Sequence, residues 1–173
     1  YMVWKTPKKD SDRWLFIPAL NMARRVAASD KHSSFVGSDF SYEDISGRDL
    51  SEDAHTVVKE EKIGDRDTVI IKSVPKDEKG TQYAYQLSWL DKQRWLPLKE
   101  EYYSKSGGLQ KVFTAETVKE IGGFWTVTKG TMKNVENHHR TEVSYEKVDY
   151  NQKIEDGLFT ERSLKNPPQK WVQ

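Results

Sequence analysis

Short segments of alternating apolar and polar residues run through most of the chain, and Gly- or Pro-containing turns separate them. The clearest example spans residues 83–89 (YAYQLSW), where alternate positions hold Tyr83, Tyr85, Leu87 and Trp89. Alternation with a period of two is typical of a strand with one buried face. Turn residues recur at intervals of about 10–15 positions, as in an antiparallel meander. The pattern therefore predicts a mainly β protein.

Glycine-containing turns connect several of these segments as expected hairpins. The turn at residues 64–65 separates the runs 56–63 and 67–74, and a Gly-Gly pair follows the long run 109–120. Glycine suits the positive φ angles that tight hairpin turns require. No pattern long enough for a regular helix occurs, apart from a short candidate at residues 158–164. We therefore expect a curved antiparallel sheet with little helix.

Residues 28–53 interrupt the alternation. They are rich in Ser, Asp and Gly, but they also contain the aromatic residues Phe35, Phe40 and Tyr42. Loops of this length are usually disordered or functional, and the interleaved aromatic rings argue against disorder. We expect an ordered lid with short helical turns, for which Ser41 and Asp44 are candidate caps.

Composition narrows the possible classes of protein. The 173 residues correspond to one ordinary domain, so we expect a single domain over residues 1–173. Twenty-eight basic residues against 27 acidic ones leave a net charge of +1, which does not favour a nucleic-acid partner. Cysteine is absent, which removes disulfides, thiolate metal sites and cysteine nucleophiles.

No arrangement of catalytic or metal-binding residues stands out. His138 and His139 are adjacent, and neighbouring residues on a strand point to opposite faces, so we interpret them as a solvated turn. The run 37–39 (GSD) lacks the full pattern and the strand-turn-helix context of a nucleophile elbow. The acidic residues of the lid lack the spacing of an EF-hand loop. We therefore expect no enzyme, no metal and no cofactor.

Aromatic residues on the predicted strands are the main candidates for a binding surface. A packed sandwich core is the simpler interpretation. With almost no helix to cover an apolar sheet face, however, a lid and an apolar ligand are candidates to cover it. The proposed lining residues are Trp14, Phe16, Tyr83, Tyr85, Leu87, Trp89, Phe113 and Tyr145. The proposed lid residues are Phe35, Phe40, Tyr42, Asp39 and Asp44, with Arg24 and Arg25 as ionic partners or surface salt bridges.

Six stretches of the chain resemble a known family. They are residues 14–20 (WLFIPAL), 24–25 (RR), 34–44 (SFVGSDFSYED), 89–91 (WLD), 96–99 (LPLK) and 158–160 (LFT). In this order and spacing they resemble the outer-membrane lipoprotein-sorting proteins of the LolA-like superfamily. The resemblance extends through essentially the whole chain.

This resemblance implies an unclosed β-barrel whose hydrophobic concave face is covered by short helices. It also implies a periplasmic carrier, without enzymatic activity, that shields lipid or lipoprotein acyl chains. An inner-membrane transporter is a candidate partner, and any membrane contact is expected to be peripheral or transient. The alternative is a periplasmic sensor or binding module that recognises an envelope protein or lipoprotein without shuttling it. Family members usually begin with a signal peptide, a helix and further strands, which we expect to be missing here.

Overall fold

The computed structural model describes residues 1–6 and 9–169, which fall into two compact units. The terminal unit combines Tyr1–Ser33 with Asn151–Gln173, and the sheet unit comprises Ser34–Tyr150. Within the described ranges, no helix is both long enough and apolar enough to cross a membrane.

The terminal unit contains a three-stranded antiparallel sheet in the order β1-β2-β3. Its strands are β1 (Met2–Trp4), β2 (Asp12–Ile17) and β3 (Met22–Val26). Pro18 ends β2 and begins a single 3-10 turn, and Asn21 adopts the left-handed conformation before β3. The helix α2 (Glu161–Lys165) is capped by Thr160 and packs on β2 and β3. The position of α2 confirms the short helix expected near the C-terminus.

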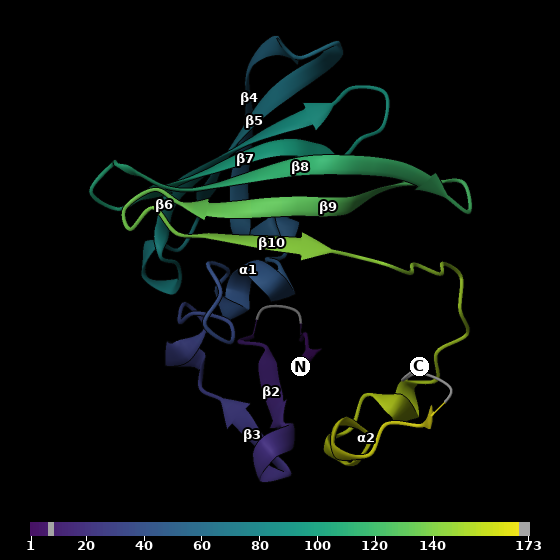
Figure 1. Cartoon of the computed structure of the whole chain (residues 1–173). Coiled ribbons are helices and arrows are strands. Elements are labelled where there is room, and N and C mark those ends of the chain that lie inside the picture. The colour runs from purple at the N-terminus through teal and green to yellow at the C-terminus, as the bar shows by residue number, and fades with distance from the viewer. Residues whose placement is uncertain (7–8, 170–173) are drawn as a thin grey trace. The chain divides into compact units, whose positions relative to one another are not determined.

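The sheet unit is built on seven antiparallel strands in the order β10-β9-β8-β7-β6-β5-β4, so each strand pairs with its neighbours in sequence (Figure 1). The strands are β4 (Asp53–Ile63), β5 (Arg66–Pro75), β6 (Tyr83–Asp91), β7 (Pro97–Ser104), β8 (Leu109–Ile121), β9 (Phe124–Asn134) and β10 (Arg140–Ser144). Strands β4 and β10 lie at opposite edges, so the sheet does not close into a barrel. This confirms the predicted fold class: mainly β, antiparallel and unclosed.

Both α-helices lie in the regions that the sequence indicated. The helix α1 (Tyr42–Ser46) lies against one face of the seven-stranded sheet (Figure 1). We call the side that α1 covers the lid face. The opposite side carries the Lys99–Glu101 and Lys129–Glu116 ion pairs, and we call it the charged face. Short 3-10 turns at Ala28–Asp30 and Leu50–Glu52 also fall within the region expected to form a lid.

One cluster of core residues in the sheet unit lies between α1 and the lid face. Tyr83, Tyr102 and Met132 are buried together, and Phe40 and Phe113 pack against them. The backbone approaches this cluster closely at Gly130, where an added Cβ would lie 2.6 Å from Cζ of Phe113. Only glycine avoids that overlap with an aromatic ring held by the core. This cluster lies where the lid meets the sheet, whereas Ile70 and Trp89 are buried as a pair on the opposite face.

Bulges decide which side chains share a face. Tyr83 pairs with Ser104 while Tyr85 pairs with Tyr103, so Ala84 is an extra residue between them. An extra residue in one strand breaks the alternation of side chains at that point. Tyr83 therefore points to the lid face, whereas Tyr85 points to the charged face. The sequence pattern had placed both on one side, and this difference arises from the bulge.

Candidate functional site

The lid segment is fixed locally by a capping box at the start of α1. The Ser41 hydroxyl accepts a hydrogen bond from the Asp44 amide at 3.0 Å, and the Asp44 carboxylate accepts from the Ser41 amide at 2.8 Å. This reciprocal arrangement satisfies two amides at the helix end that would otherwise lack partners. It confirms the predicted capping role of both residues.

Asp44 also anchors α1 to the sheet. The Lys111 ammonium lies 3.2 Å from the Asp44 carboxylate, and the Tyr83 hydroxyl donates to it at 3.2 Å. Both charged side chains are largely buried. Burial, together with the neighbouring Asp44 charge, raises the pKa of Tyr83 well above its ordinary value. The phenol therefore stays protonated and remains a hydrogen-bond donor to the lid.

A second anchor joins the lid to β10. The Asp39 carboxylate accepts a hydrogen bond from the Thr141 hydroxyl at 2.7 Å and lies 2.8 Å from Nδ1 of His139. The Asp39 amide in turn donates to the Thr141 hydroxyl at 2.9 Å. Asp39 is buried, whereas the His139 side chain is largely exposed. Polar contacts therefore hold the lid at both ends of its attachment to the sheet.

Aromatic side chains fill the space between these polar anchors. The rings of Phe40 and Phe113 meet edge to face with centroids 6.4 Å apart, and those of Phe35 and Tyr42 do so at 5.4 Å. Phe113 contributes to the lid face from β8. Of the proposed lid residues, Phe35 and Tyr42 thus contact each other, and Phe40 reaches the sheet through Phe113.

An apolar strip continues across the lid face on β4, β5 and β6, away from α1. Val57 pairs with Ile71, and Val69 pairs with Leu90, so all four side chains point to this face. Val57 is 68% exposed, and the other three are partly exposed. Paired apolar residues that keep accessible surface offer a place for an apolar ligand.

A polar cluster separates the apolar strip from the aromatic core. One oxygen of the Glu100 carboxylate accepts from the Gln86 amide at 2.8 Å and from the Ser88 hydroxyl at 3.3 Å. The other accepts from the Tyr102 hydroxyl at 2.8 Å. Burial raises the pKa of Glu100 in spite of these donors, with a further contribution from the Asp44 charge. This cluster was not predicted from the sequence. The one local signal for it is the pair 102–103 (YY), which stands among polar residues.

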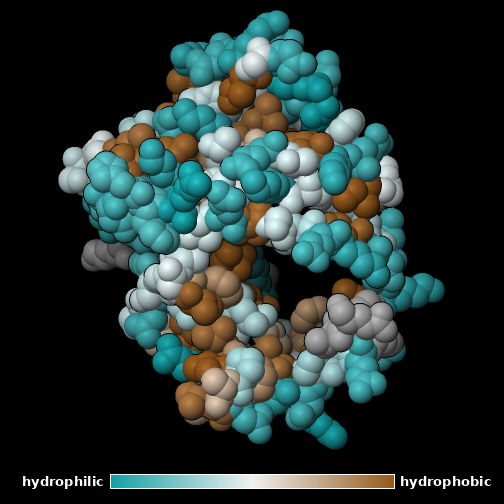
Figure 2. All heavy atoms as spheres, in the orientation of Figure 1, coloured by the Kyte–Doolittle hydropathy of each residue, from teal (hydrophilic) through white to brown (hydrophobic). Residues whose placement is uncertain are grey.

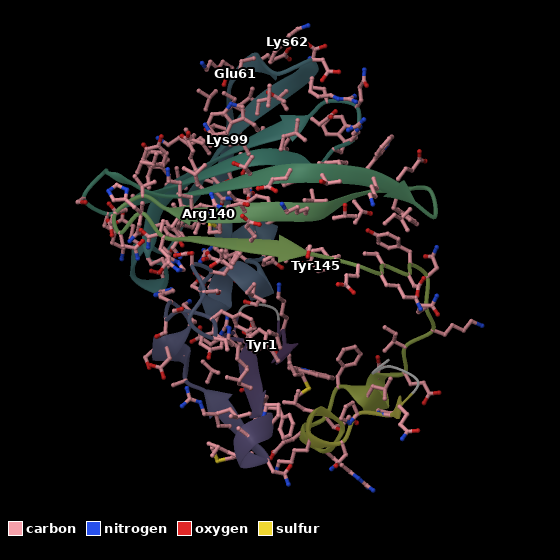
Figure 3. The ribbon with its side chains drawn as sticks, in the orientation of Figure 1. Tyr1, Glu61, Lys62, Lys99, Arg140 and Tyr145 are labelled. Carbon is pink, nitrogen blue, oxygen red and sulfur yellow. The ribbon has the colours of Figure 1, made fainter. Side chains whose placement is uncertain are left out.

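Three of the proposed lining residues lie on the charged face. Tyr85 stacks on Tyr103 with centroids 4.4 Å apart, and Trp89 donates its indole N–H to Glu61. Lys99 lies 4.5 Å from the centre of the Trp89 ring (Figure 3). Leu87 pairs with Glu101 between them. The structure therefore separates these residues from Phe113 and Tyr83, which lie on the lid face.

The remaining proposed residues lie elsewhere. Tyr145 follows β10 and is 59% exposed (Figure 3). Trp14 and Phe16 lie partly buried on β2 of the terminal unit. Arg24 and Arg25 are exposed on β3, and Arg25 forms an ion pair with Asp12. A cavity of about 370 Å³ in this unit is lined by Asp10, Ser11, Arg25, Val26, Ala27 and Ala28.

Exposed aromatic residues also gather at one end of the seven-stranded sheet. Trp95, in the turn between β6 and β7, is 73% exposed and has a positive φ of 55°. The guanidinium of its neighbour Arg94 lies 4.1 Å from the centre of the Trp125 ring on β9. Phe124 contacts Tyr150 with centroids 4.9 Å apart. A bulky residue in the left-handed region is strained, so this turn presents Trp95 at an energetic cost.

The lid face thus combines an anchored lid, an apolar strip and a buried carboxylate. On the side shown in Figure 2, hydrophilic residues cover most of the sheet unit, with small hydrophobic patches between them. Among the residues that the structure describes, no group of three or more His, Asp or Glu side chains is placed to hold a metal ion. The arrangement can bind an amphiphilic molecule through apolar contact and hydrogen bonding.

Comparisons with known proteins agree with this arrangement. No curated protein matches the chain. A family model described as "Uncharacterized protein" matches residues 1–166. A domain from Vibrio parahaemolyticus assigned to outer membrane lipoprotein sorting is 30% identical, with a TM-score of 0.84. That alignment covers 90% of this chain and 66% of that protein.

Two further crystal structures share the fold. A LolA superfamily protein from Nitrosomonas europaea has a TM-score of 0.67 and is 22% identical, covering 87% of this chain and 67% of its own. A DUF1329 family protein from Desulfovibrio piger has a TM-score of 0.88 and is 32% identical, covering 94% of this chain and 69% of its own. The chain thus spans about two thirds of the length of each of these proteins. The resemblance found in the sequence is confirmed, and the chain belongs to the DUF1329 family, which has the LolA-like fold.

Proposed function

We propose that the sheet unit binds acyl chains of lipids or lipoproteins on its lid face and carries them through the periplasm. The observation that carries this proposal is the partly exposed apolar strip of Val57, Val69, Ile71 and Leu90 on the lid face, which the Glu100 cluster separates from the aromatic core. Burying each CH₂ group of an acyl chain there would contribute about 0.8 kcal/mol.

The way the lid is attached supports reversible binding. Its two anchors are polar, through Asp44 to Lys111 and Tyr83, and through Asp39 to Thr141. Water can replace such contacts when the segment lifts, but lifting also exposes the aromatic cluster beneath α1, so the lid favours the closed state. A carrier needs a lid that closes over its cargo and can still open at a finite cost in free energy, because it must bind the cargo and then release it.

Kinship supports the cellular context of the proposal. The relative from Vibrio parahaemolyticus is assigned to outer membrane lipoprotein sorting. On this basis we infer a periplasmic location, non-enzymatic binding and an inner-membrane transporter as a partner. Peripheral membrane contact would suit the exposed Trp95, Trp125 and Tyr150, because Trp and Tyr favour the membrane–water interface.

Titration with a fluorescent fatty-acyl probe tests the proposal. Affinity is expected to rise about fourfold for each added CH₂ group until the apolar strip is covered, and to change little with salt. Val57→Asp places a charge within the strip and should weaken probe binding by about tenfold or more. Val57 is exposed, so this variant should still fold.

Thr56→Asp provides the matched control. Thr56 is the neighbouring exposed residue on β4, and its side chain points to the charged face. It should leave probe binding unchanged. Equal losses in the two variants, or affinity that ignores chain length and collapses in high salt, would contradict acyl-chain binding on the lid face. A stable complex with an envelope protein and no bound lipid would favour the binding-module alternative.

A further inference from the structure

Glu100 occupies the middle of the lid face, between the apolar strip and the aromatic core. Across β7 and β8 it pairs with Phe113, which contacts Phe40 of the lid. Across β6 it pairs with Ser88, whose other neighbour on β5 is Ile71. An acyl chain bound along the strip would therefore end close to this carboxylate.

The Glu100 carboxylate can accept another hydrogen bond. A carboxylate has about four lone-pair sites, and three are used by Gln86, Ser88 and Tyr102. The oxygen bound by Tyr102 accepts only that one of the three hydrogen bonds. Glu100 as a whole residue keeps part of its surface exposed, and the site requires a ligand to approach its carboxylate from that side.

The local charge favours a donor over an acceptor. When it is ionised, Glu100 adds a second negative charge near Asp44, whose own charge is paired with Lys111. Burial and the Asp44 charge both raise the pKa of Glu100, which means that its existing donors do not fully compensate the ionised carboxylate. A further donor, or a positive charge, would improve that compensation.

We propose that Glu100 is the head-group site of the lid face and selects an amphiphile whose polar end donates a hydrogen bond, such as a long-chain amine or alcohol. A fatty acid would be disfavoured wherever Glu100 is ionised, because its carboxylate would then meet Glu100 with like charge. This inference rests on the proposed function, since it requires the acyl chain to lie on the apolar strip. Gln86 and Ser88 then act as positioning residues that orient the Glu100 carboxylate.

The neighbouring residue offers an internal comparison. Glu101 also accepts a hydrogen bond from a tyrosine two residues later, at 2.7 Å from Tyr103, but it points to the charged face. It also pairs with Lys99 at 2.6 Å. If the two carboxylates had only a structural role, substituting Glu100 or Glu101 would change ligand preference to the same small extent. If Glu100 is the head-group site, only its substitution changes that preference.

The experiment compares three ligands of equal chain length, dodecylamine, dodecanol and dodecanoate, as competitors of a fluorescent apolar probe. The wild-type protein should bind dodecylamine at least about tenfold more tightly than dodecanoate, with dodecanol in between, because a hydrogen bond to a charged group contributes that much. Glu100→Gln should reduce this preference to about threefold or less. Glu101→Gln should retain the wild-type preference.

Each outcome bears on the inference. A wild-type protein that binds all three ligands equally would overturn the head-group site while leaving acyl-chain binding intact. Retention of the full preference in Glu100→Gln would also overturn it. Failure of every ligand to displace the probe would overturn the proposed function and this inference together. The wild-type comparison alone can refute the site, so the test does not depend on the variant folding.

Discussion

The two faces of strands β6 and β7 use the same residue types in opposite ways. On the lid face, Tyr83 and Tyr102 are buried with ring centroids 4.9 Å apart. On the charged face, Tyr85 and Tyr103 stack at 4.4 Å but remain partly exposed. The comparison shows that two aromatic rings in contact do not by themselves form a hydrophobic core. Burial does so, because it removes the whole apolar surface from water.

The ionic contacts differ in the same manner. Lys111 and Asp44 form a largely buried pair that connects the sheet to α1. On the charged face, Lys129 pairs with Glu116 and Glu142 across neighbouring strands, and all three side chains are accessible to water. A buried charge depends on its partner, whereas an exposed one is stabilised by solvent. The faces should therefore respond differently to equivalent substitutions.

The largest expected contrast comes from truncating the two adjacent tyrosines. Tyr102→Ala should lower the free energy of unfolding by about 3–5 kcal/mol, because it empties the core beside Met132. Tyr103→Ala should cost only about 1 kcal/mol, the typical contribution of a partly exposed aromatic stack. Urea denaturation of both variants measures the difference. Similar losses would show that the charged face is as tightly packed as the lid face.

Breaking the buried pair should have the next largest effect. Asp44→Asn keeps the shape of the residue but leaves the Lys111 ammonium without its opposite charge, at a cost of about 3 kcal/mol. Glu142→Gln, which breaks the exposed Lys129 pair on the charged face, should cost less than about 1 kcal/mol.

A second substitution tests the origin of the loss at Asp44. Adding Lys111→Met to Asp44→Asn removes the unpaired charge and should recover much of the stability. The loss in Asp44→Asn should also increase proteolysis of residues 34–53, because the anchor of α1 is weakened. Additive effects in the double variant would mean that the two side chains do not act as a pair.

The smallest expected contrast is in how stability depends on pH, which should have opposite directions for Glu100 and Glu116. Burial raises the pKa of Glu100, so the folded protein binds that proton more tightly than the unfolded chain does. Its favourable contribution is present at low pH and is lost as the pH rises through the folded pKa. Hydrogen bonds from Lys129 and Thr131 lower the pKa of Glu116, so its contribution is present at higher pH and is lost as the pH falls.

Urea midpoints measured between about pH 4 and pH 7 can separate the two carboxylates. Relative to wild type, Glu100→Gln should gain stability as the pH rises, whereas Glu116→Gln should lose it. Parallel pH profiles for the two variants would contradict the assignment of opposite environments. Arg24→Gln, an exposed change on β3, serves as a control that should not alter the pH dependence of the wild-type protein.

Local sequence signals predicted the elements of this fold well. The alternation at residues 83–89 gave β6, the glycine turns gave the hairpins, and Ser41 and Asp44 formed the expected capping box. Each of these features depends on residues within a few positions of one another. The resemblance to LolA-like proteins added the unclosed sheet, which local patterns do not specify.

The candidate site depended on contacts that local patterns do not contain. One extra residue at Ala84 sent Tyr83 to the lid face and left Tyr85, Leu87 and Trp89 on the other, although their spacing in the sequence is regular. A bulge depends on how β6 pairs with β7, so the alternation of a single strand does not reveal it.

The sequence by itself therefore determined the strands, turns, helix cap and family, because these follow from short-range backbone preferences and a recognisable motif order. Only the tertiary structure decided that Asp44 meets Lys111, 67 positions away, and that Glu100 lies beside Phe113 on the lid face. Strand register sets those neighbours, and register is a property of pairs of strands rather than of any one segment.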